Sequence, residues 1–207
     1  MAELRFFFGT MGSGKSTLAL QIHHNLTQAG RHGLLLTQLD RIEAAVSSRL
    51  GVAQPAIEVD PELNLLELAE NVLDEVGALH FLVCDEAQFF LPEQVEQLAE
   101  IVDQLDVDVY AFGLLTDFRG HLFEATIRFL ELADRRHEVQ VEARCWCNRP
   151  ATHNARIVNG RQVYEGDTVL VADFEGENAL VSYELLCRRH WMEGRPRSRA
   201  ESLASHT

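Results

Sequence analysis

The stretch "LRFFFGTMGSGKST", residues 4–17, joins an apolar run to a glycine-rich pattern. The run at 4–9 is short and continuous, as in strands that are buried on both faces of a parallel sheet. Residues 9–16 match GxxxxGK[ST], and a helical pattern follows over 16–29. A strand before this pattern and a helix after it form the context that predicts a phosphate-binding loop.

The predicted loop has the chemistry that nucleotide phosphates require. Its glycines let consecutive backbone N–H groups converge on phosphate oxygens at a helix N-terminus. Lys15 is placed to reach the β- and γ-phosphates, and the Ser16 hydroxyl to bind Mg²⁺. The alternative, a glycine-rich turn that binds nothing, agrees less well with the flanking strand and helix. The expected phosphate-binding residues are Gly9, Thr10, Met11, Gly12, Ser13, Gly14, Lys15 and Ser16.

Strand-like and helix-like segments alternate through the first two thirds of the chain. Further apolar runs of strand length lie at 33–37, 79–84 and 108–113. Further helical patterns lie at 63–76, 92–105 and about 122–135, and "HEVQVEARC" (137–145) alternates as a strand. This order predicts an α/β domain built on a doubly wound parallel sheet, which we place at 1–138.

Two adjacent carboxylates end the apolar run of "LVCDEAQFF" (82–90). If this run is a strand, Asp85 and Glu86 point to opposite faces and cannot share one role. In nucleotide-binding sheets an acid at a strand end holds Mg²⁺, and this is the role predicted for Asp85. Glu86 is then free to accept a proton from a second substrate. The alternative, two surface charges at a strand end, is less favoured behind a complete phosphate loop.

Aromatic residues follow the acids and also follow a later strand. Phe89 is the better candidate for stacking on a flat ring, and Phe90 is the better candidate for the core. Phe118, in "GLLTDFRGHLF" (113–123), lies just beyond a predicted strand end. Open α/β sheets bind their ligands at the C-terminal ends of strands, so a ligand is expected there.

The character of the chain changes after residue 138. Short strand-like pieces such as "DTVLVA" (167–172) replace the helices, and "NG" at 159–160 marks a hairpin turn. Residues 139–191 are therefore predicted to form a small second module. The tail 192–207 is poor in apolar residues and is expected to be disordered.

The second module contains a candidate metal site. Cys187-x-x-His190 has metal-ligand spacing, and thiolates with an imidazole suit tetrahedral Zn²⁺. Cys145-x-Cys147 would supply the other two ligands, although it is shorter than the usual Cys-x-x-Cys, and His153 is an alternative ligand. Structural zinc is favoured over free thiols because the module has few core residues.

Composition and charge limit the remaining possibilities. The 207 residues carry 18 Lys+Arg against 32 Asp+Glu, a net charge of −14. This charge argues against a nucleic acid polymer as the main partner, since affinity there comes from phosphate neutralisation. No guanine-specificity motif of the NKxD type is present, which favours ATP over GTP.

The chain also has no run of 18 apolar residues that predicts a membrane span, and its N-terminal apolar run is too short for a signal peptide. A cytoplasmic location is therefore expected, with no membrane partner. Cysteines in that compartment bind metals or remain buried thiols, and Cys84, inside a predicted strand, is expected to be buried.

Together these pieces resemble the type II (cellular-type) thymidine kinases. "GTMGSGKST" (9–17) is similar to that family's phosphate loop, "DEAQFF" (85–90) to its acidic motif, and "DFRGHLF" (117–123) to its DFRGxPF segment. "CWCNRPATHNAR" (145–156) and "YELLCRRH" (183–190) resemble the two halves of its zinc-bearing lasso. The resemblance spans about residues 4–191, and the motifs in this order are specific although each alone is shared with other proteins.

The resemblance implies a fold, an activity and partners. The fold is a RecA-like P-loop domain with a small C-terminal zinc-binding lasso module. The activity is transfer of the γ-phosphate of Mg-ATP to the 5′-hydroxyl of thymidine or deoxyuridine, in the salvage of DNA precursors. Structural Zn²⁺, a homotetramer and inhibition by the end-product triphosphate are also implied.

The resemblance also assigns roles to residues. Glu86 matches the family's general base. The residues matched to the ATP side, in addition to 9–16, are Thr17, Asp40, Arg41, Asp85 and Gln88. The residues matched to the nucleoside are Met11, Phe89, Leu114, Phe118, Asn154, Thr168, Val169, Leu170, Val171, Ala172 and Tyr183. Residues 168–172 act there through main-chain groups.

The sequence departs from the family pattern at three places besides Cys-x-Cys. The family's D-x-R motif is adjacent Asp40-Arg41 here, and Asn154 stands where the family has a threonine. "ADFEGENALVS" (172–182) makes the lasso longer.

Two other functions stay open. A P-loop with a zinc module could be an ATPase that binds nucleic acid through the metal module. The acidic charge and the absence of a basic patch with interleaved aromatic residues speak against it. ATP turnover with thymidine, compared with turnover with single-stranded DNA, distinguishes this ATPase from a thymidine kinase. A kinase for another deoxynucleoside is the nearer alternative.

Overall fold

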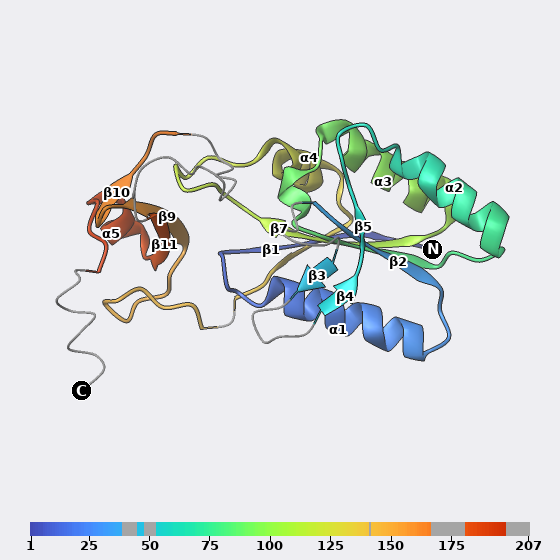
Figure 1. The fold of residues 1–207 in the computed structure, drawn as a ribbon, viewed down its shortest axis with the longest axis horizontal. Coiled ribbons are helices and arrows are strands. Elements are labelled where there is room, and N and C mark those ends of the chain that lie inside the picture. The colour runs from blue at the N-terminus through green and yellow to red at the C-terminus, as the bar shows by residue number, and fades with distance from the viewer. Residues whose placement is uncertain (39–44, 48–52, 141, 167–180, 198–207) are drawn as a thin grey trace. The chain divides into compact units, whose positions relative to one another are not determined.

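The computed structural model describes residues 1–38, 45–47, 53–140, 142–166 and 181–197 (Figure 1). The chain divides into two compact units. The N-terminal unit comprises Met1–Leu115 and Phe123–Val139, and the C-terminal unit comprises Thr116–Leu122 and Gln140–Thr207. The loop 116–122 thus belongs to the same unit as the C-terminal part of the chain. The division into domains at 1–138 and 139–191 stays a prediction.

The N-terminal unit is built on a six-stranded sheet with the order β5-β2-β6-β7-β1-β8, and every pair in it is parallel. Its strands are β1 (Leu4–Gly9), β2 (Gly33–Thr37), β5 (Ile57–Glu58), β6 (Phe81–Asp85), β7 (Asp108–Leu114) and β8 (Arg135–Glu138). Its helices are α1 (Lys15–Gln28), α2 (Leu65–Val76), the 3₁₀ turn η1 (Ala87–Phe89), α3 (Pro92–Leu105) and α4 (Glu124–Leu132). A short antiparallel pair, β3 (Ala45–Ser47) and β4 (Ala53–Pro55), lies outside this sheet. The prediction of an α/β fold with a parallel sheet is confirmed.

Helices cover both faces of the sheet, which explains why its strands read as continuous apolar runs. α1 lies on one face and α2, α3 and α4 lie on the other (Figure 1). In β6, Phe81 and Val83 pack into the cluster that contains α1, whereas Leu82 and Cys84 pack into the cluster that contains α2–α4. Cys84 is fully buried, as predicted.

The C-terminal unit holds a three-stranded antiparallel sheet with the order β10-β9-β11. Its elements are β9 (His153–Val158), β10 (Arg161–Val163), β11 (Val181–Leu186) and the short helix α5 (Arg188–Met192). Val158 pairs with Arg161, so Asn159 and Gly160 form a two-residue turn, and both have positive φ, 51° and 79°. These angles are those of a type I′ hairpin, which confirms the predicted turn.

The predicted strand at 137–145 is wrong over most of its length. The predicted strand at 167–172 lies outside the described residues. The alternating segment 137–145 is a strand only to Glu138 in β8. Farther on, Glu142 has a positive φ of 43°, and the Cys145 N–H donates to the Arg149 carbonyl at 2.9 Å. The chain therefore turns tightly where a strand was expected, and the turn brings two cysteines together.

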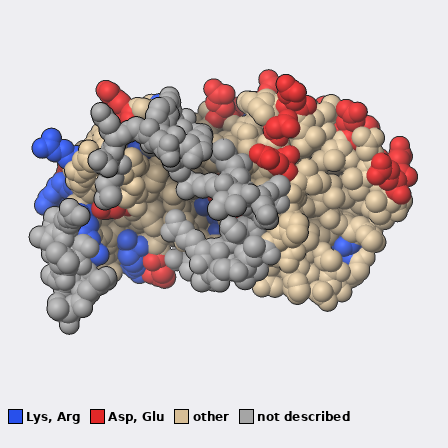
Figure 2. Space-filling model, in the orientation of Figure 1, with Lys and Arg blue, Asp and Glu red and all other residues tan. Residues whose placement is uncertain are grey.

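The surface charge is unevenly distributed over the helices. Figure 2 shows acidic side chains gathered over the part of the N-terminal unit where α2, α3 and α4 lie. Exposed acids on these helices are Glu67, Glu70, Asp74, Glu75, Glu93, Glu96, Glu100, Asp103, Glu124 and Glu131. Such a face repels a polyanion. Across the described ranges, no helix combines the length and the apolar character needed to cross a membrane.

Candidate functional site

The predicted phosphate loop connects β1 to α1, and its glycines adopt conformations that other residues avoid. Gly12 and Gly14 have φ of 69° and 89°, in the left-handed region. A Cβ on Gly9 would lie 2.3 Å from the Val139 carbonyl oxygen and 2.6 Å from Ser13 Oγ, so only glycine fits there. No side chain caps α1 at Gly14. The loop therefore leads the first N–H groups of α1 toward a position where an anion is favoured.

Two hydroxyl groups inside the loop are placed to donate hydrogen bonds to a bound phosphate. Ser13 is fully buried, and the hydroxyl oxygens of Thr10 and Ser13 have no hydrogen-bond partner among the described residues. A buried hydroxyl without a partner is unusual in a folded protein. Phosphate oxygens would accept such hydroxyl protons.

Lys15 is the only lysine among the 207 residues, every other basic side chain being arginine or histidine. It is buried, and its Nζ donates to the Thr10 carbonyl at 2.8 Å and lies 3.5 Å from the Gly9 carbonyl. A compact ammonium fits between these carbonyls, whereas the planar guanidinium of arginine is larger and forked.

We expect Lys15→Ala to weaken ATP binding by about 10–100-fold, because it removes a charge-assisted hydrogen bond to phosphate. Calorimetry with ATP measures the effect. Lys15→Arg is the matched control, because it keeps the charge and loses the compact geometry, and it should recover only part of the affinity. Unchanged affinity in Lys15→Ala would mean that the loop is only a turn.

Asp85 ends β6 and is buried, with 4% of its surface exposed. Burial raises the pKa of Asp85 to about 6, and the neighbouring Glu86 carboxylate adds to the shift. A hydrogen bond from the Ser16 side chain and the charge of Lys15 act in the opposite direction. The structure thus brings Ser16 and Asp85 together, and a cation at this place would favour the charged form of the carboxylate.

Glu86 does not lie on the strand, so the argument from strand alternation is wrong for it. β6 ends at Asp85, and Glu86 has φ 52° and ψ 31°, a left-handed conformation that opens η1. The turn, rather than the pleat, directs its side chain. The two acids nevertheless have different surroundings, because Asp85 is buried and Glu86 is half-buried.

Gln88, matched to the ATP side, is buried and forms hydrogen bonds with Glu86 and with the main chain of Leu114. Its Nε2 donates to Glu86 Oε2 at 2.6 Å, and its Oε1 accepts the Leu114 N–H at 2.9 Å. Phe89 is half-buried and meets Phe123 edge to face at 5.5 Å. Phe90 is a core residue, as predicted.

The loop 116–122 packs within the C-terminal unit and carries Phe118. Asp117 Oδ1 accepts the N–H groups of Arg119 and His121, which closes the loop into a turn. The Trp191 indole N–H donates to the Phe118 carbonyl at 3.1 Å. A Cβ on Gly120, where φ is +80°, would lie 2.8 Å from the Trp191 ring. Trp191 therefore holds the main chain at Phe118 and just after it, a role that its sequence context did not reveal.

Arg156 is a further residue that sequence analysis missed. It is buried, its guanidinium carbon lies 3.7 Å from the centre of the Phe118 ring, and its Nε donates to the Tyr183 hydroxyl at 2.9 Å. Arg156 and Tyr183 are direct cross-strand partners in β9 and β11. Asn154 is two residues earlier on β9, is also buried, and donates to the Thr116 carbonyl at 3.4 Å. Because side chains two apart share a strand face, the period of β9 could have suggested Arg156.

The predicted metal ligands come together in the C-terminal unit. The ligand atoms of Cys145, Cys147, Cys187 and His190 all lie within 4.8 Å of one another. Cys145 Sγ is 3.3 Å from His190 Nδ1, and Cys147 Sγ is 3.8 Å from Cys187 Sγ. A tetrahedral zinc with bonds of about 2.3 Å separates its sulfur ligands by about 3.8 Å. The cluster fits zinc, and His153 is not one of its members.

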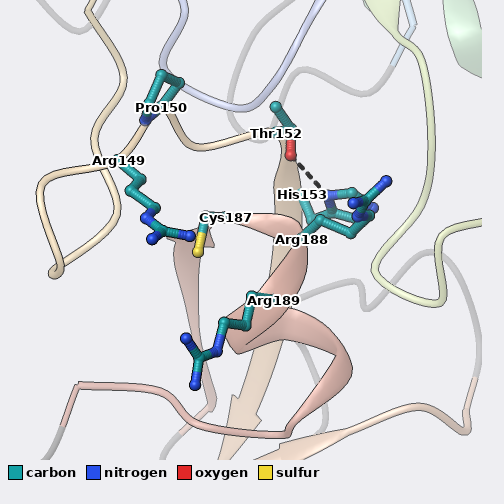
Figure 3. A pocket seen from close by; sticks show the side chains of 7 residues that line it. All are labelled: Arg149, Pro150, Thr152, His153, Cys187, Arg188 and Arg189. Carbon is teal, nitrogen blue, oxygen red and sulfur yellow. Dashed lines mark hydrogen bonds between the residues drawn. The ribbon is translucent and has the colours of Figure 1, made fainter.

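The surroundings of the cluster act differently on Cys145 and Cys147. The backbone N–H of Arg149 lowers the pKa of Cys147, whereas burial raises the pKa of Cys145. A depression of about 520 Å³ beside the cluster is lined by Arg149, Pro150, Thr152, His153, Cys187, Arg188 and Arg189. In Figure 3 the Arg149 guanidinium points toward Cys187, whereas that of Arg189 points away from it. Cationic groups near a thiol stabilise the thiolate that a metal requires.

We expect purified protein to contain about one zinc per chain, because four ligands close a tetrahedron. Cys145→Ser and Cys147→Ser should each lower the zinc content, whereas the matched control His153→Ala should retain it. Elemental analysis of the purified variants measures this. Full zinc in Cys147→Ser together with loss in His153→Ala would transfer the fourth ligand to His153.

Several predicted site residues lie outside the described residues. They are Asp40, Arg41, Thr168, Val169, Leu170, Val171 and Ala172. Met11 and Leu114 are half-buried, and Thr17 is exposed in the first turn of α1. Within the described residues, the N-terminal unit therefore presents the predicted phosphate loop with two carboxylates, and the C-terminal unit presents a cluster that could hold a metal and a packed aromatic loop.

Comparison with known proteins agrees with this combination. The family model described as "Thymidine kinase" matches residues 2–191. A thymidine kinase of Streptomyces avermitilis is 51% identical over 191 residues, which cover 92% of this chain and 88% of that protein. One of Cutibacterium acnes is 49% identical over 94% of this chain and 90% of its own length, and one of Francisella tularensis is 34% identical over 94% and 98%. The chain belongs to the thymidine kinase family.

Proposed function

We propose that this chain transfers the γ-phosphate of Mg-ATP to the 5′-hydroxyl of thymidine and of deoxyuridine. The observation that carries the proposal is the arrangement at the end of β6. There the Ser16 side chain and the Lys15 charge act on the buried Asp85 carboxylate, and Glu86 turns away from the strand as a second carboxylate. One acid thus accompanies the phosphate loop, and the other is available to an alcohol.

The roles follow from the charges that develop in phosphoryl transfer. The transition state is loose, so positioning and neutralisation of phosphate charge contribute most. Lys15 and the N–H groups at the start of α1 would hold the phosphates, with Thr10, Ser13 and Thr17 around them. Mg²⁺, when bound with ATP, neutralises charge on the phosphate oxygens, and Ser16 and Asp85 would hold it. Glu86 would accept the hydroxyl proton.

The residues proposed to bind the nucleoside come from both units. Met11, Phe89 and Leu114 belong to the N-terminal unit, and Phe118, Asn154 and Tyr183 belong to the C-terminal unit. The Phe118 ring is held by Arg156 and by the turn around Asp117, so it is preorganised for contact with a flat ring. Main-chain groups of residues 168–172 are proposed to read the base edge.

Zinc in the Cys and His cluster is proposed to be structural. All four ligand positions of a tetrahedron would be filled by protein, which is typical of structural rather than catalytic sites. The resemblance further supports a cytoplasmic homotetramer that is inhibited by its end-product triphosphate, and both features remain proposals.

The test is formation of thymidine 5′-monophosphate from thymidine and Mg-ATP by the purified chain. Product should appear in stoichiometric amount with ADP. ATP hydrolysis stimulated by single-stranded DNA, without nucleoside phosphorylation, would support the ATPase alternative instead. The acidic face over α2–α4 argues against that outcome.

A further inference from the structure

The side chain of Gln88 forms a bridge inside the N-terminal unit. It is 2% exposed, donates from Nε2 to Glu86 Oε2 at 2.6 Å, and accepts the Leu114 N–H at Oε1, 2.9 Å away. A carboxylate can only accept and a backbone N–H can only donate, so the two partners fix which way the amide points. The amide therefore connects Glu86 to the end of β7 in one defined orientation.

The surrounding chain is shaped for this bridge. The register of β6 with β7 ends at the pair Cys84–Ala111, so the last residues of β7 extend beyond β6. Gly113 lies in that extension, and a Cβ on it would come within 3.0 Å of both Gln88 N and Gln88 Oε1. A side chain at position 113 would push the amide away. The close approach of η1 to β7 is thus permitted by glycine.

Glu86 needs such support because its backbone is in an uncommon conformation. A non-glycine residue at φ 52° is maintained only when the surrounding contacts determine it. A glutamate side chain has several rotamers, and a half-buried one would sample them in the absence of a fixed partner. The short hydrogen bond from Gln88 to an ionised oxygen is of the stronger, charge-assisted kind and selects one rotamer.

We propose that Gln88 is a positioning residue that holds the Glu86 carboxylate in its proton-accepting orientation, with the Leu114 N–H as its anchor. This inference rests on the proposed role of Glu86 as the base. It replaces the assignment of Gln88 to the ATP side. The same bridge fixes the main chain at Leu114, which the resemblance matches to the nucleoside.

Gln88→Glu separates positioning from packing. The new side chain has the same size and can still accept the Leu114 N–H, but as a carboxylate it has no N–H to donate to Glu86 and places a second negative charge beside it. We expect kcat to fall about 10–100-fold, part of the usual contribution of a general base, with the KM for ATP changed less than about twofold. Gln94 offers a matched control, because it is equally buried and its Nε2 donates to the Asp60 and Leu63 carbonyls. Gln94→Glu should lower the melting temperature and leave kcat within about twofold.

A double-mutant cycle with Glu86→Gln tests whether Gln88 acts through Glu86. If Gln88 acts through Glu86, Gln88→Glu lowers kcat in the wild-type background and has less than about a twofold effect in the Glu86→Gln background. Equal losses in both backgrounds, or no loss in the wild-type background, overturn the inference and leave the proposed function intact. Full turnover in Glu86→Gln alone would overturn the base assignment itself. If Gln88→Glu does not fold, Gln88→Met, which removes both hydrogen bonds, goes through the same cycle with the same criteria.

Discussion

Glu86→Gln is expected to lower kcat by about 10²–10⁴-fold, the usual contribution of a general base. The substitution keeps the size of the side chain, and its amide oxygen can still accept the hydrogen bond from Gln88. The fold and ATP affinity should therefore be unchanged, and only proton acceptance is lost. Initial rates of thymidine phosphorylation give kcat, and calorimetry gives the dissociation constant for ATP.

Asp85→Asn is the matched control, because it changes the neighbouring acid on the phosphate side. Its expected effect is weaker binding of Mg²⁺, so that a higher Mg²⁺ concentration is needed for half-maximal activity, rather than loss of proton acceptance, since the charges of Lys15 and Glu86 act on Asp85. A Glu86→Gln variant that keeps more than half of wild-type turnover would show that Glu86 is not the base.

Deoxycytidine is expected to be a very poor substrate, with kcat/KM roughly 10⁴-fold below that of thymidine. Thymine and uracil present acceptor, donor and acceptor along the edge formed by O2, N3–H and O4, whereas cytosine changes the last two groups. If main-chain donors and acceptors at 168–172 read the base, as proposed, they cannot exchange roles, and two groups would face like partners. Each unsatisfied group costs about 1–3 kcal/mol.

Asn154 is the side chain whose flexible amide could relax this selectivity. It is buried, and its Nδ2 donates to the Thr116 carbonyl, so its orientation is held within the C-terminal unit. Asn154 is therefore expected to leave the selectivity intact. Deoxyuridine lacks only the 5-methyl group, which is proposed to contact apolar side chains, and it should be about tenfold or slightly more below thymidine.

A panel of nucleosides with Mg-ATP, monitored for each 5′-monophosphate, measures these ratios. Asn154→Thr is an informative control, since it removes the amide and should not raise activity with deoxycytidine. Similar kcat/KM for deoxycytidine and thymidine would refute main-chain reading of the base.

Local patterns were sufficient for the parts of this protein that depend on neighbouring residues. GxxxxGKS predicted a strand, a loop and a helix in that order, which β1 and α1 form, and apolar runs that alternate with helical patterns predicted the parallel sheet. The hairpin at Asn159–Gly160 followed from its turn residues. The cysteines and histidine that form the metal cluster were chosen by ligand spacing, and the fold brings those four together. The segment 137–145 was misread because alternation continues through a tight turn.

By itself, the sequence determined the chemical groups that are available and most of the order of strands and helices, because these depend on residue type and short-range periodicity. Only the tertiary structure decided how Glu86 is directed, what Gln88 contacts and where the loop 116–122 packs. These features depend on hydrogen bonds between distant residues: Leu114 lies 26 positions from Gln88, Asn154 lies 38 from Thr116, and Trp191 lies 73 from Phe118. Contacts between residues so far apart form only when the whole chain folds, so local sequence patterns do not predict them.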